Sequence, residues 1–222
     1  MTDDEIDECV RRYLGDRRPT SRYASFDYCF NHFQGYREDD RLEQLLEPDH
    51  LQVACLQLGF YLASWGMFGR GAKLSTHSAK VLEPVVKAIV TSPRDAWELD
   101  VQGYDREGIA LALALGERFR AVLPGGWSRT LQSKTLLGVF GCVPAFDRFV
   151  NKGLGVSGFR RKALVRVRDF HDEHAEALDR HRRPTIEFAT GATTDRRYTR
   201  AKVVDMVFFV KGGGSPAVID GA

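Results

Sequence analysis

Between residues 48 and 65 the chain carries apolar side chains on every face of a helical repeat. Leu51, Cys55, Leu58 and Leu62 keep helical spacing, and most of the residues between them are also apolar. A helix that is apolar all round is normally enclosed by the rest of the protein. The sequence therefore predicts that this helix lies at the centre of the fold.

Helical periodicity recurs along the rest of the chain. Residues 197–210 suit a strand or a helix, because they are rich in valine and phenylalanine; three valines on one helical face favour a helix. Pro84 should kink its helix or open its last turns. The other predicted helices cover residues 3–14, 26–34, 81–89, 106–122, 145–152 and 159–182.

The helical segments leave room only for short loops. With 222 residues and 43% hydrophobic content, the chain can bury one core. We expect an all-α fold, a compact multi-helix globular domain over residues 1–222, with a flexible tail from about residue 212. Four widely separated cysteines lack the close spacing of zinc or redox sites, so we expect buried free thiols. They are Cys9, Cys29, Cys55 and Cys142.

The first residues, MTDDEIDECVRRYLG, mix acidic and apolar positions without a basic start. They do not resemble a secretory or mitochondrial signal, so we expect a cytoplasmic protein. The apolar run 51–67 is interrupted by polar residues and falls short of the roughly 20 residues that span a membrane. We therefore expect no membrane partner.

Arginines cluster although the net charge is only +2. Arg160, Arg161 and Lys162 open the stretch FRRKALVRVR, which could follow a nucleic-acid backbone, since phosphate binding depends on clustered cations. A solvated helix face is the alternative interpretation.

The stretch LPGGWSRTLQSKTLLGVFGCVPAFDRFV, residues 123–150, combines a turn, an apolar run and a proline. Ser128 or Thr130 can cap a helix after the LPGG turn, and Pro144 breaks the backbone. Asp147 then lies near the start of the next helix, where the exposed backbone amides favour a carboxylate. Local structure alone thus makes Asp147 a helix cap.

The same stretch resembles the helix-hairpin-helix DNA glycosylases. Leu123, Pro124 and Gly125 match the hairpin of that family, Pro144 and Asp147 match its later pair, and 147 − 123 = 24 residues separate hairpin and aspartate as in the family pattern. The resemblance implies that hairpin amides hold a DNA phosphate and that the aspartate stabilises positive charge on the sugar. Such enzymes act on a base extruded from the duplex.

On that hypothesis the hairpin residues Gly125 and Gly126 bind nucleic acid, with Lys134 or Arg129 holding the DNA backbone. Trp127 replaces the second hairpin glycine and should obstruct a phosphate. Arg129 stands where some members carry a Schiff-base lysine, and arginine does not deprotonate. The resemblance therefore implies a monofunctional glycosylase acting on duplex DNA. RNA is the alternative partner, under the ribonuclease hypothesis that follows.

Two further patterns concern residues 168–181. Arg168 and His174 are similar to the arginine and histidine of the HEPN ribonucleases, which cleave RNA without metal as dimers. His171 and His174 lie one turn apart, but His181 is too far along to complete a metal site. We expect no metal and, without a glycine-rich strand-loop-helix, no cofactor.

Three functional hypotheses remain: a DNA-glycosylase-like protein, a HEPN-like ribonuclease and a noncatalytic helical binding module. The stretches FDYCFNHFQ and LASWGMFGRGAKL are also similar to bacterial helical proteins of unknown activity, a resemblance that implies no function.

Overall fold

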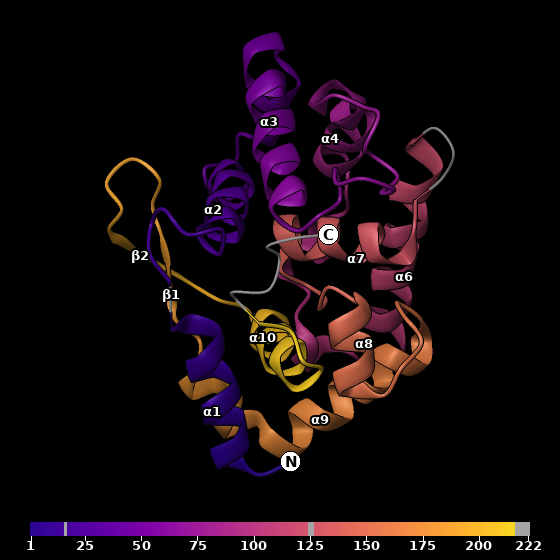
Figure 1. Cartoon of the computed structure of the whole chain (residues 1–222). Helices are drawn as coiled ribbons and strands as arrows, with labels where there is room; N and C mark the ends of the chain where they lie inside the picture. The colour runs from indigo at the N-terminus through magenta and orange to yellow at the C-terminus, as the bar shows by residue number, and fades with distance from the viewer. Residues whose placement is uncertain (16, 124–126, 216–222) are drawn as a thin grey trace.

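The computed structural model describes residues 1–15, 17–123 and 127–215, and its helices surround a single core (Figure 1). This all-α architecture confirms the predicted fold class. The α-helices are α1 (Asp3–Leu14), α2 (Ala24–Glu38), α3 (Pro48–Ser64), α4 (Glu83–Val90), α5 (Arg94–Glu98), α6 (Arg106–Val122), α7 (Arg129–Phe140), α8 (Arg148–Leu154), α9 (Arg161–Arg180) and α10 (Arg200–Lys211). Short 3-10 helices are η1 (Leu42–Leu46), η2 (Ala79–Leu82) and η3 (Val101–Gly103), and the strands are β1 (Pro184–Ile186) and β2 (Thr193–Arg197).

Helices that begin at a strong local cap match their predicted ranges. Thr2 and Glu5 form a reciprocal capping box at the start of α1. Asp105 accepts hydrogen bonds from the amides of Glu107 and Gly108 and so starts α6. These interactions span at most three residues, so the local sequence was sufficient to predict where both helices lie.

The valine-rich segment near the C-terminus is helical from Arg200 onward, and only Arg197 at its start belongs to a strand. β2 pairs antiparallel with β1, with Pro184 opposite Arg197, and α10 begins three residues later. Asp100, in the loop before η3, accepts hydrogen bonds from the amides of Arg200 and Ala201 at 2.8 and 2.9 Å. The helix prediction for most of this segment is confirmed, and a remote carboxylate helps to start the helix.

α10 occupies the centre of the fold. Every residue from Ala201 to Val210 is buried, and α1, α8 and α9 pack around this helix (Figure 1). Residues 212–214 remain hydrogen bonded to its last turns, at Phe208, Phe209 and Val210. The chain thus stays part of the core just beyond the point where a tail was predicted to begin.

The prediction that α3 is the enclosed central helix is wrong. One of its faces is buried through residues such as Leu58 and Leu62, but Val53, Leu56 and Phe60 are 44%, 52% and 60% exposed. The neighbouring helices α2, α4 and α7 cover only one side of α3. Apolar composition did not reveal that no described element covers the other side.

Two helix boundaries also differ from expectation. Pro84 lies in the first turn of α4 and causes no kink, because its missing amide would have no helical partner there. α7 ends at Gly141, before Pro144, in a left-handed conformation with φ of 66°. A side chain at Gly141 would also collide with Phe30 and Thr199.

The buried-thiol prediction holds for three cysteines: Cys29, Cys55 and Cys142 are buried, whereas Cys9 is half-buried. Across the residues that the structure describes, no helix is both long and apolar enough to cross a membrane.

The two faces of α3 should respond differently to the same substitution. Leu58→Ala should lower the free energy of unfolding by about 2–5 kcal/mol, because it opens a cavity in the core. Leu56→Ala, two residues earlier on the exposed face, should change it by less than about 0.5 kcal/mol. Urea unfolding at low protein concentration measures both values, and equal losses would contradict the described burial.

Candidate functional site

Helices α6 and α7 are joined by the turn that carries the glycosylase-like residues. Ser128 caps α7 by accepting a hydrogen bond from the amide of Leu131 at 3.1 Å. Gly125 and Gly126, predicted to contact a phosphate, lie outside the described residues. Trp127 is buried and packs towards Phe119. Its indole therefore does not project into solvent.

Asp147 is the N-cap of α8, as its local sequence predicts. Its Oδ1 accepts hydrogen bonds from the amides of Phe149 and Val150 at 2.9 and 3.0 Å. Side chains of α7 hold the preceding residue: Ser133 Oγ accepts from the Phe146 amide, and Thr130 donates to the Phe146 carbonyl. These bonds place Asp147 beside α7.

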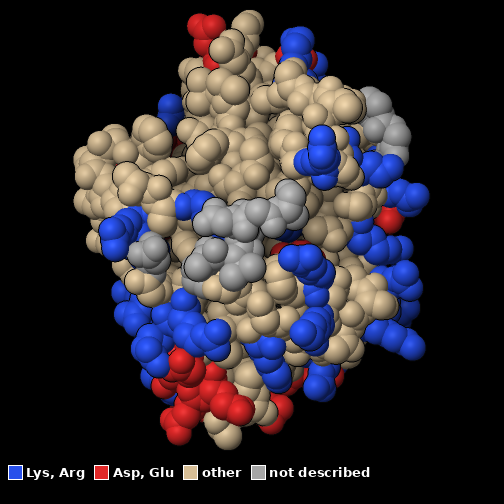
Figure 2. All heavy atoms as spheres, viewed as in Figure 1, with Lys and Arg blue, Asp and Glu red and all other residues tan. Residues whose placement is uncertain are grey.

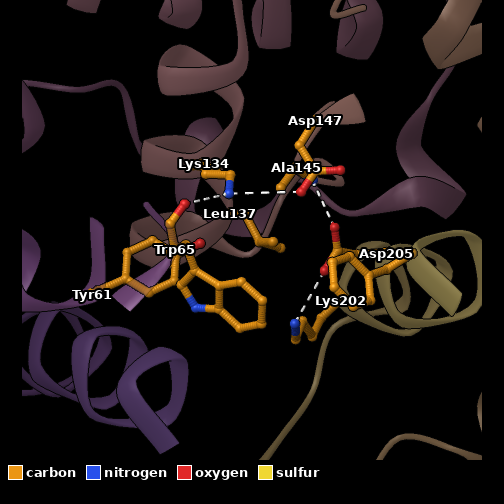
Figure 3. Close-up of a pocket in the computed structure, with 9 residues that line it drawn as sticks. Tyr61, Trp65, Lys134, Leu137, Ala145, Asp147, Lys202 and Asp205 are labelled. Atoms are coloured by element: carbon orange, nitrogen blue, oxygen red, sulfur yellow. Dashed lines mark hydrogen bonds and ion pairs between the residues drawn. The ribbon is translucent and has the colours of Figure 1, made fainter. Parts of the chain in front are cut away.

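The second carboxylate oxygen of Asp147 faces a buried lysine (Figure 3). Lys134 Nζ lies 3.6 Å from Asp147 Oδ2 and donates a hydrogen bond to the carbonyl of Trp65 at 2.9 Å. Desolvation lowers the pKa of Lys134 below its ordinary value, although Asp147 opposes that shift. Lys134 is therefore wrongly predicted as a DNA-backbone contact, because α3 and α7 bury it.

A second ion pair completes this cluster. Lys202 Nζ lies 3.1 Å from Asp205 Oδ2, one turn along α10, and donates to the hydroxyl of Tyr13 at 2.8 Å. Asp205 Oδ1 accepts a hydrogen bond from the Ala145 amide at 2.9 Å. Desolvation raises the pKa of Asp205, while Lys202 acts in the opposite direction. The backbone from Ala145 to Asp147 therefore connects the two ion pairs, because Ala145 binds Asp205 and Asp147 faces Lys134.

These four side chains line a small cavity with aromatic walls. Tyr61, Trp65 and Phe209 contribute rings to it, and Trp65 lies edge-on to Phe209 with ring centroids 5.9 Å apart. The cavity volume is about 10 Å³, which is the space of one water molecule. Gly138 permits this packing, since a side chain on it would collide with the Tyr61 ring. The structure thus holds Asp147, itself half-buried, beside a cavity of the size of one water molecule.

The remaining predicted nucleic-acid-binding residues are exposed. The guanidinium of Arg129 donates to the carbonyl of Phe159 at 2.7 Å, which brings it next to Arg160, Arg161 and Lys162. Figure 2 shows Lys and Arg side chains gathered on the part of the surface where α6, α8 and α9 lie in Figure 1. Arg148 and Lys152 add two exposed cations from α8. The structure therefore places the cation of Arg129, at the start of α7, next to the cations at the start of α9.

The ribonuclease-like pair does not form a shared site within the chain. Arg168 is paired with Asp169 at 2.7 Å. His174 is buried, and its Nδ1 lies 3.2 Å from Asp3 of α1. His181 is likewise paired with Asp7 at 2.6 Å. These histidines therefore connect α9 to α1. Among the residues that the structure describes, no group of three or more potential ligands could hold a metal ion.

Most of the cluster around Asp147 was not predicted from the sequence. Lys202 and Asp205 stand within AKVVDMVFFV, where two charges interrupt an apolar helix, and this pattern could have marked them as paired. Tyr61 and Trp65 offered no such indication, because aromatic residues in an apolar helix usually belong to the core.

Comparisons with models of protein families, with characterised proteins and with solved structures found no match to this chain.

The Lys202–Asp205 pair should show strong coupling in a double-mutant cycle. Lys202→Met and Asp205→Asn should each lower the free energy of unfolding by about 3–5 kcal/mol, because each leaves a buried group without its partner. The double variant should lose clearly less than the sum of the two. Additive losses in urea unfolding would show that the pair is not coupled.

Lys134 should give stability a characteristic dependence on pH. Between its lowered folded pKa and its ordinary value of 10.5, the unfolded chain holds the proton and the folded protein does not. The free energy of unfolding therefore rises with pH in this window. The free energy of unfolding of wild type, relative to that of Lys134→Met, should rise as pH approaches 10.5. Titrations common to both proteins cancel in this comparison. Parallel pH profiles would contradict the shift.

Proposed function

We propose that this protein binds duplex DNA and releases a damaged or mispaired base, in the manner of a monofunctional glycosylase. The observation that carries the proposal is the double use of Asp147. Asp147 stands 24 residues after Leu123. One of its oxygens caps α8, and the other faces an aromatic pocket (Figure 3). A helix cap alone requires neither the pocket nor the spacing.

The proposed chemistry is electrostatic. As the bond between base and sugar breaks, positive charge develops on the sugar, and a nearby carboxylate lowers the energy of that state. The base departs with the electron pair of the broken bond, water adds its oxygen to the sugar carbon, and the proton that water loses is transferred to the base. Lys134 takes the role of a positioning residue, since its Nζ is 3.6 Å from the Asp147 carboxylate and is too deeply buried to contact a phosphate.

The DNA backbone would lie across the exposed cations. Arg129, Arg160, Arg161 and Lys162 provide a sequence-independent surface for phosphates, and no ion pair with a described residue neutralises them. The pocket of about 10 Å³ is far too small for a base. The proposal therefore requires that Trp65 separate from Phe209 when a base enters, a movement that tryptophan fluorescence can follow.

Asp147→Asn tests the catalytic role without removing the cap. Asparagine also accepts hydrogen bonds from helix amides, so the variant should fold, whereas base release should fall on the order of 100-fold or more. The assay measures base release from duplexes carrying alkylated, deaminated or oxidised bases, with both proteins well below their unfolding temperatures.

Asp105→Asn is the matched control for this assay. Asp105 caps α6 through two amides, in the same way as Asp147 caps α8, but it is exposed and lies outside the pocket. Base release should be unchanged in this variant. If no duplex loses a base, or if Asp147→Asn releases it at the wild-type rate, the glycosylase proposal is wrong. DNA binding without release would then identify a noncatalytic binding module.

A further inference from the structure

The exposed face of α3 carries an apolar stripe that no described part of the chain covers. Val53, Leu56 and Phe60 are separated by three and four residues, so their side chains lie on one helical face. The exposed residue Ala63 extends this face towards the end of α3. Isolated exposed apolar residues are ordinary, but a continuous stripe of this kind is typical of an interaction surface.

A groove of about 440 Å³ lies beside the stripe, between η1, α3 and η2. Leu46, Leu51 and Leu56 give the groove an apolar lining. The ion-paired side chains of Lys80 and Glu83 also line it. The upper part of Figure 2, where α2, α3 and α4 lie in Figure 1, shows few charged side chains. Leu46 of η1 and Ala79 of η2 also line the groove, so the apolar surface extends beyond α3.

Opposite charges stand at the two ends of α3. Glu43 and Asp49 are exposed near its N-terminal end, whereas Arg70 and Lys73 are exposed in the loop that follows its C-terminal end. None of these four side chains is paired with a described residue. That loop starts against α3, since the Met67 amide donates to the Leu62 carbonyl at 2.9 Å.

This distribution is self-complementary. If two copies of α3 pack antiparallel, the acidic end of each helix meets the basic loop of the other. Leu56 is the midpoint of α3, so it would lie at the two-fold axis. Position 53 would then face position 59 of the second copy, which places Val53 beside the neighbouring Phe60. The antiparallel arrangement also opposes the two helix dipoles favourably. A parallel pair would instead bring like charges together at both ends.

We propose that this face of α3 forms a two-fold symmetric, antiparallel dimer of the chain. The inference is independent of the proposed activity, because the stripe and the Asp147 pocket use different residues. The second copy would cover the exposed apolar side chains and pair the four free charges.

Sedimentation velocity over a range of protein concentrations tests the dimer. Wild type should shift from monomer to dimer by about 100 μM, whereas Leu56→Lys and Phe60→Lys should stay monomeric with unchanged thermal stability at low concentration. Phe188→Lys is the matched control, since Phe188 is 74% exposed but lies between β1 and β2. It should not alter dimerisation. A monomeric wild type, or full dimerisation of both α3 variants, would overturn the proposal.

The orientation is tested by cysteine cross-linking and charge exchange. Leu56→Cys should form a disulfide between copies, whereas Asp49→Cys should not. In an antiparallel pair only a residue at the two-fold axis lies close to the same residue of the second copy. Glu43→Arg and Arg70→Glu should each weaken the dimer about 2- to 5-fold, and the double variant should restore it. Efficient cross-linking of Asp49→Cys, or no restoration, would overturn the antiparallel arrangement.

Discussion

A buried ion pair on α10 joins parts of the chain that are far apart in sequence. Lys202 reaches Tyr13 on α1, and Asp205 holds the Ala145 amide in the loop between α7 and α8. Removing either charge would leave the other in the core without its partner, which costs about 3–5 kcal/mol. The position of Asp147, two residues after Ala145, thus depends on a helix that begins more than fifty residues later.

The two interpretations of Asp147 are compatible because a carboxylate has two oxygens. Oδ1 satisfies the first amides of α8, and Oδ2 faces Lys134 within the pocket. Asp105 caps α6 in the same way, yet it is surrounded by solvent. What distinguishes Asp147 is therefore its surroundings, which α3, α7 and α10 provide together. A capping motif cannot reveal those surroundings, since they come from other parts of the chain.

Charge and apolar surface are distributed unequally over the molecule. Exposed cations lie on the side of α6, α8 and α9, acidic residues gather on α1, and few charges lie over α2, α3 and α4 (Figures 1 and 2). A net charge of only +2 conceals this arrangement, because opposite charges on separate faces cancel in the sum. The proposed DNA surface and the proposed dimer surface consequently occupy chemically different regions.

By itself, the sequence determined the all-α class and the helices whose ends depend on near neighbours, as at Thr2, Asp105, Ser128 and Asp147. Tertiary structure alone decided that α10, and not α3, is enclosed, and that Lys134 is buried beside Asp147. It also brought Asp100 to the start of α10, a hundred residues away. A cap is a local hydrogen bond between residues a few positions apart, so its pattern is visible in the sequence. Burial depends on which remote elements cover a surface, and apolar composition is the same whether a helix face is covered or left open.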